Sequence, residues 1–111
     1  MTDTTYNGWT NYETWLVNLW IDTEEGSQAY WRDEAQTASD NPTPNPFIES
    51  RADRARITLS VQLKNQFEER ASELVDVTGF WADLLGAALS AVNWREIAEH
   101  VLADVEESAT A

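Results

Sequence analysis

Residue types that could carry catalysis are scarce in this chain of 111 residues. His100 is the single histidine and cysteine is absent, so we expect no catalytic triad, no thiolate or histidine-rich metal site and no disulfide. The four glycines are scattered singly, which excludes a glycine-rich phosphate loop. We therefore expect a protein that is not an enzyme and that binds no obligatory metal or cofactor.

Carboxylates beside His100 remain the one arrangement that could bind a metal ion. Metal centres in helical bundles combine Glu-x-x-His pairs from two helices. Here Glu96 and His100 are four residues apart, not three. We expect His100 to be partly exposed and paired with Glu96 or Asp104 of its own helix.

The charge of the chain is strongly one-sided, with seven basic against 20 acidic residues and a net charge of −13. Such a surface repels both nucleic acid and anionic membranes. Some acids recur at helical spacing, with Glu69, Glu73 and Asp76 in one row and Glu96 and Glu99 in another. Rows of this kind can imitate a phosphate backbone, and they can equally be the solvated faces of ordinary helices. Both interpretations stay open.

Amino-acid usage offers a second explanation of the charge. Lys64 is the only lysine, while acidic residues, alanine and threonine are abundant. This usage is typical of proteins from salt-loving organisms, whose surface acids maintain solubility. A salt-adapted helical interaction or structural protein of a virus or archaeon, without nucleic-acid mimicry, is therefore the alternative function.

Aromatic residues are concentrated near the N-terminus and could stack on nucleic-acid bases. However, the first 31 residues contain no lysine or arginine, which disfavours direct nucleic-acid binding. We expect Trp15 and Trp20 in the core, and Tyr6 and Trp9 as a hydrophobic staple on the first helix. Trp9 also joins Trp31 as an exposed aromatic residue that could anchor a partner.

Periodicity predicts an all-α fold, a single compact domain of four or five helices over residues 1–111. A capping box of Thr10 and Glu13 opens a helix over 11–22. A second helix over 24–38 has few large apolar residues and is expected to lie across the surface. The proline-rich loop at 39–47 follows, because prolines at alternate positions forbid helix.

The C-terminal half predicts three further helices. An apolar stripe favours helix over 48–74, although residues 57–63 also alternate with period two and could form a strand. A strongly amphipathic helix follows from Phe80, and Asn93 caps a last helix with Glu96 at its third position. We expect one core that contains Trp15, Leu19, Trp20, Leu63, Phe67, Trp81, Leu84, Leu85, Leu89, Trp94, Ile97 and Val101.

Two segments of the chain are especially distinctive: residues 6–22, YNGWTNYETWLVNLWID, and residues 82–100, ADLLGAALSAVNWREIAEH. They resemble the N-terminal and C-terminal motifs of a family of small uncharacterised acidic proteins from phages, archaeal viruses and plasmids. The resemblance implies a mobile-element origin and brings no catalytic residues. Small acidic proteins of that origin are similar in size and charge to anti-restriction and anti-CRISPR inhibitors.

These observations together predict a non-enzymatic inhibitor that binds a nucleic-acid-binding defence complex of the host. No segment approaches the ~20 apolar residues of a membrane span, and the N-terminus lacks a basic signal region. We expect a cytoplasmic location in the host cell, as a monomer or a homodimer. The residues expected to contact the partner are Glu69, Glu73, Asp76, Glu96, Glu99, Trp9 and Trp31.

Overall fold

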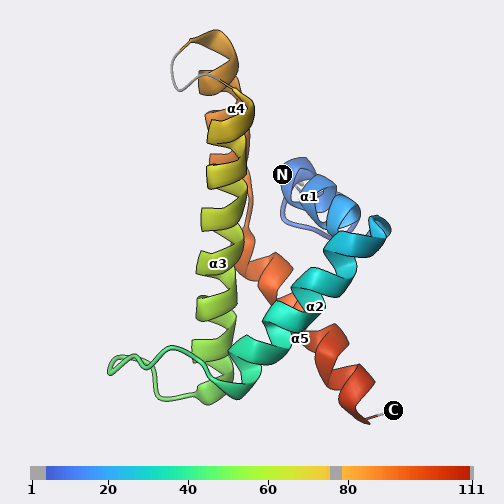
Figure 1. Cartoon of the computed structure of the whole chain (residues 1–111), viewed down its shortest axis with the longest axis vertical. Helices are drawn as coiled ribbons and strands as arrows, with labels where there is room; N and C mark the ends of the chain where they lie inside the picture. Colours follow the sequence, from blue (N-terminus) through green and yellow to red (C-terminus); the bar gives the residue numbers. More distant parts are fainter. Residues whose placement is uncertain (1–4, 76–78, 111) are drawn as a thin grey trace.

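The computed structural model describes residues 5–75 and 79–110, except for the side chains of 107–110, and all regular elements in these residues are helices. The prediction of an all-α single domain is confirmed, and residues 57–63 are helical. None of the described helices is long and apolar enough to cross a lipid bilayer. The helices are α1 (Tyr12–Thr23), α2 (Glu25–Asp40), α3 (Arg51–Leu74), α4 (Phe80–Ala91) and α5 (Trp94–Thr110) (Figure 1).

Side-chain caps decide where three of these helices begin. Asn11, not Thr10, caps α1, because its extended backbone lets its side chain accept the Thr14 N–H at 2.9 Å. Ser50 caps α3 in the same way, so this helix begins three residues later than expected. The predicted cap of α5 is confirmed, since the Asn93 side chain accepts the Glu96 N–H at 3.1 Å.

Helix α2 lies across the surface, as expected, with nine of its 16 residues exposed, but it also supplies a buried face to the core. It contacts α1, α3 and α5 (Figure 1) and buries Trp31, Ala35 and Ala38. A side chain that is only a methyl group lets neighbouring helices approach closely. The burial of α2 therefore depends on two small residues, which a search for large apolar residues overlooks.

The core lies where α2, α3 and α5 meet. Trp31 of α2 stacks on Phe67 of α3 with 6.2 Å between ring centroids, and Phe67 contacts Trp94 of α5 at 5.4 Å. Of the residues predicted for the core, Leu63, Trp94, Ile97 and Val101 are buried, Phe67 and Leu89 pack against them, and Trp15 and Leu85 are half-buried.

Helix α1 presents an unexpectedly polar face to the bundle. Its buried residues are Thr14, Asn18 and Ile21, whereas Trp20 is 62% exposed and Leu19 is also exposed. The assignment of Leu19 and Trp20 to the core is therefore wrong. The reason is that Thr14 and Asn18 form hydrogen bonds to other side chains and backbone groups, so the inward face is chosen by polar complementarity.

The molecule is more extended than its length predicts. Its radius of gyration is 15.0 Å, compared with about 13 Å for a compact domain of this length. Its accessible surface is 7519 Å², compared with ~6,200 Å² for a protein of this mass. Figure 1 shows that the C-terminal end of α3 and the N-terminal end of α4 extend beyond the other helices.

Candidate functional site

The first acidic row lies at this extended end of the molecule. Glu69 and Glu73 are exposed on the last turns of α3. Arg70 partly neutralises Glu73, because its guanidinium donates to the carboxylate at 2.9 Å. Asp76, the third predicted member of the row, lies outside the described residues.

The second acidic row occupies a different part of the surface. Glu96 accepts the Thr10 N–H at 2.9 Å, and Glu99 pairs with Arg56 of α3 at 3.5 Å. Arg56 and Glu73 are 73 − 56 = 17 residues apart on α3, which corresponds to about 26 Å along the helix. The two rows therefore do not join into one continuous acidic strip.

The two tryptophans expected to be exposed anchors are both engaged within the fold. Trp31 is only 5% exposed, so the expectation that it lies on the surface is wrong. Trp9 is half-buried, and its ring meets the His100 ring edge-on at 5.2 Å. Tyr6 alone acts as the predicted staple on α1, with its ring centroid 4.9 Å from that of Trp15.

A tight turn between Tyr6 and Trp9 lets their side chains pack against different helices. Asn7 and Gly8 both have positive φ angles, 48° and 87°, as a type I′ turn requires. The backbones of Tyr6 and Trp9 then exchange two hydrogen bonds of 2.8 Å each. The turn sends Tyr6 toward α1 and Trp9 toward α5.

An exposed apolar cluster, here called the tip patch, lies at the same extended end of the molecule as the first acidic row, while Glu69 and Glu73 themselves face α2. On α4, Leu84 lies four residues after Phe80 and three after Trp81, which places it beside both on the helix surface. The Phe80 and Trp81 rings meet edge-on at 5.0 Å. Trp81 is 69% exposed and α4 has no fully buried residue. The tip patch consists of Leu74, Phe80, Trp81 and Leu84, all exposed.

The prediction that Trp81 and Leu84 lie in the core is therefore wrong. The width of the apolar face of α4, which can be read from the sequence, already indicates that one helix cannot cover all of it. At 100° per residue, the apolar residues from Phe80 to Leu89 cover roughly 180° of the helix circumference, wider than the ~100° of a one-sided amphipathic helix. Leu85 and Leu89 take the side that faces α3. The remaining apolar residues then have no helix to cover them.

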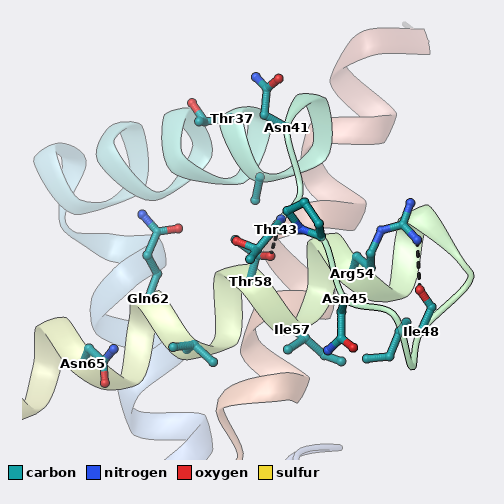
Figure 2. A pocket seen from close by; sticks show the side chains of 13 residues that line it. Thr37, Asn41, Thr43, Asn45, Ile48, Arg54, Ile57, Thr58, Gln62 and Asn65 are labelled. Carbon is teal, nitrogen blue, oxygen red and sulfur yellow. Dashed lines mark hydrogen bonds between the residues drawn. The ribbon is translucent and has the colours of Figure 1, made fainter.

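A hollow of about 490 Å³, with a lining that is more apolar than polar, lies between α2, the proline-rich loop and α3. Figure 2 shows mainly amide and hydroxyl side chains around it, such as those of Asn41, Asn45 and Gln62. Arg54 donates to the Ile48 carbonyl at 2.9 Å, which holds the loop onto α3. The described residues that line the hollow include neither a carboxylate nor an imidazole, so they offer no acid–base pair.

A cluster of polar side chains joins α1 to α5. His100 Nε2 lies 3.2 Å from Asp22 Oδ2 of α1, so the expectation that His100 pairs with Glu96 or Asp104 of its own helix is wrong. Asp104 still contributes, because ligand atoms of Asp22, His100 and Asp104 all lie within 4.8 Å of one another. Packing between helices, not spacing along one helix, therefore assembles this cluster.

Comparison with known proteins shows the family of the chain. No curated protein and no solved structure matches it significantly. The sequence model of a family of unknown function, DUF7249, matches residues 2–107. This range includes both distinctive segments, 6–22 and 82–100. The protein therefore belongs to the DUF7249 family.

Proposed function

We propose that the protein is a non-enzymatic inhibitor, encoded by a phage, an archaeal virus or a plasmid, that acts in the cytoplasm of the host cell. Its partner is a nucleic-acid-binding defence complex, a restriction enzyme or a CRISPR effector. The observation that carries the proposal is the tip patch at the extended end of the molecule, where exposed carboxylates also lie. The proposed contact is therefore not a purely acidic imitation of DNA. Its centre is the aromatic tip patch, and acidic side chains contribute around it.

The tip patch has the composition of a binding centre. Exposed aromatic residues of this size are uncommon in clusters on monomeric proteins, and tryptophan is enriched among the residues that dominate binding energy.

The surrounding charges favour a basic partner over a second copy of the chain. Asp83 is exposed on α4 within the same turns as the tip patch, Glu69 and Glu73 are exposed on the last turns of α3, and the net charge is −13. A homodimer through this patch would bring the same carboxylates face to face, and like charges across an interface are costly. The basic groove of a nucleic-acid-binding protein attracts both the carboxylates and the whole molecule.

Replacing Trp81 by serine is expected to weaken partner binding by at least about 30-fold, the effect of losing one dominant anchor. Immobilised protein is exposed to host lysate at about 0.15 M and about 1 M salt, because salt screens the carboxylates and not the aromatic contact. The captured effector is identified by mass spectrometry, purified, and its affinity for each variant measured. The Glu69→Gln, Glu73→Gln double variant should have a lower affinity for the effector at about 0.15 M salt and an unchanged affinity at about 1 M salt, where the carboxylates are screened.

Trp20→Ser is the matched control, since Trp20 is 62% exposed and lies on α1, away from the tip patch. It should bind as the wild type does. Full binding by Trp81→Ser, or capture of no nucleic-acid-binding effector, contradicts the proposal. A chain that captures nothing and gains thermal stability with salt fits the salt-adapted alternative. A homodimer that Trp81→Ser dissociates assigns the patch to self-association.

A further inference from the structure

We propose that Asp22, His100 and Asp104 bind one divalent transition-metal ion that links α1 to α5. The proposal goes beyond the inhibitor function and is independent of it. Its starting point is the juxtaposition of one imidazole and two carboxylates from opposite ends of the chain, with ligand atoms within 4.8 Å of one another.

The cluster is built from two pairs of residues spaced i, i+4. Asn18 and Asp22 form the pair on α1, and His100 and Asp104 form the pair on α5. Residues at this spacing lie on the same helix face, so each helix presents two polar side chains to the other. Facing pairs on neighbouring helices are the arrangement from which bundles build metal centres.

Distances within the cluster fit a coordination sphere. Bonds of 2.0–2.1 Å place neighbouring ligand atoms about 2.9–3.4 Å apart in octahedral or tetrahedral geometry. His100 Nε2 and Asp22 Oδ2 are 3.2 Å apart. An Asp104 oxygen lies within 4.8 Å of both atoms, and a side-chain rotation that moves this oxygen by up to ~1.5 Å completes the third position. Imidazole with carboxylates, without thiolate, suits Zn²⁺, Mn²⁺ or Co²⁺.

Asn18 supplies an independent indication of a ligand at this position. It is only 5% exposed, and its Nδ2 donates to Asp22 Oδ2 at 2.9 Å. Its Oδ1 is buried and accepts no hydrogen bond from the part of the chain that the structure describes. The two atoms belong to one amide and lie about 2.3 Å apart. Asn18 Nδ2 would orient the Asp22 ligand toward the ion, as outer-shell hydrogen bonds do in metal sites.

Two neighbouring groups bear on the affinity of the site. Arg32 lies 3.9 Å from Asp104, and both side chains are about a third to a half exposed. An ion pair so exposed contributes little, so an ion displaces it readily. On the other side, the Trp9 ring packs edge-on against His100 at 5.2 Å and holds the imidazole in place.

Titration with Zn²⁺ is expected to show one ion bound per chain, measured by calorimetry on the metal-free full-length protein. Saturating Zn²⁺ should raise the Tm by at least about 5 °C, because the ion binds only the folded state. Co²⁺ provides a second probe, through its visible absorption and its quenching of the nearby Trp9 fluorescence. His100→Gln and Asp104→Asn should each weaken binding at least tenfold.

Asp33→Asn is the matched control, because Asp33 is exposed on α2 outside the cluster and should leave the affinity unchanged. Circular dichroism verifies that each variant is folded. The proposal fails if the wild type binds no Zn²⁺ or Co²⁺ above background. It also fails if His100→Gln and Asp104→Asn bind as tightly as Asp33→Asn, which would indicate nonspecific binding to surface carboxylates.

Discussion

Trp31→Ala is expected to lower the free energy of unfolding by about 3–5 kcal/mol, the range for deleting a buried tryptophan side chain. Trp31 is 5% exposed, and its ring lies between α2 and Phe67 of α3. The cavity would open at the centre of the bundle, where the helices cannot collapse without losing their other contacts. Such a loss is a large part of the ~5–15 kcal/mol that stabilises a domain. Urea unfolding followed by circular dichroism measures it.

Trp20→Ala is the control for the same chemical change on the surface. Trp20 is 62% exposed on α1, so its truncation should change the free energy of unfolding by no more than about 0.5 kcal/mol. Equal effects of the two substitutions would contradict the burial of Trp31 between α2 and α3. A small effect of Trp31→Ala alone would show that this residue is exposed after all, as the sequence pattern suggests.

Thr14→Val is expected to destabilise the protein by about 1–3 kcal/mol, although valine has nearly the same shape. The Thr14 side chain is fully buried. Its hydroxyl accepts the Asn93 N–H at 2.8 Å and donates to Asn11 Oδ1 at 2.6 Å. Valine removes both bonds and leaves the Asn93 N–H without its partner. The same unfolding measurement gives the loss, and circular dichroism reports the helix content.

Thr37→Val is the matched control, since the Thr37 hydroxyl donates only to a backbone carbonyl on the exposed side of α2. Water can replace that bond, so a change of about 0.5 kcal/mol or less is expected. If Thr14→Val proved as harmless as Thr37→Val, the two helix starts would not be held together by Thr14. Asn11 would then be the main link, because its Nδ2 also donates to the Ala91 carbonyl.

Helix identity and most helix ends could be predicted from the sequence because they depend on local interactions. The Asn93 cap is a contact between residues three apart, and prolines at alternate positions prevent helix wherever they occur. The exception at α1 shows the limit of local reasoning. Thr10 is a good capping residue, but its N–H is bound by Glu96 and its hydroxyl by Asn93, so Asn11 takes the cap.

Which aromatic side chains are buried could not be read from the same pattern. The pattern predicts an exposed Trp31 and a buried Trp81, whereas in the structure Trp31 is buried and Trp81 is exposed. Burial of a helix face requires a second element to cover it. Ala35 and Ala38 admit α3 and α5 onto α2. Helix α4 contacts α3 and α1, yet these contacts leave Phe80, Trp81 and Leu84 exposed in the tip patch.

The sequence by itself thus determined the helical fold, the proline-rich loop, the acidic surface and the position of Glu69 and Glu73 on one helix face. Only the tertiary structure decided which acids stand beside exposed aromatic residues and which are engaged elsewhere. It also brought His100 to Asp22, 78 residues away. The physical reason is that helix formation is governed by neighbours within about four residues, while burial and cross-helix contacts depend on how distant segments pack against one another.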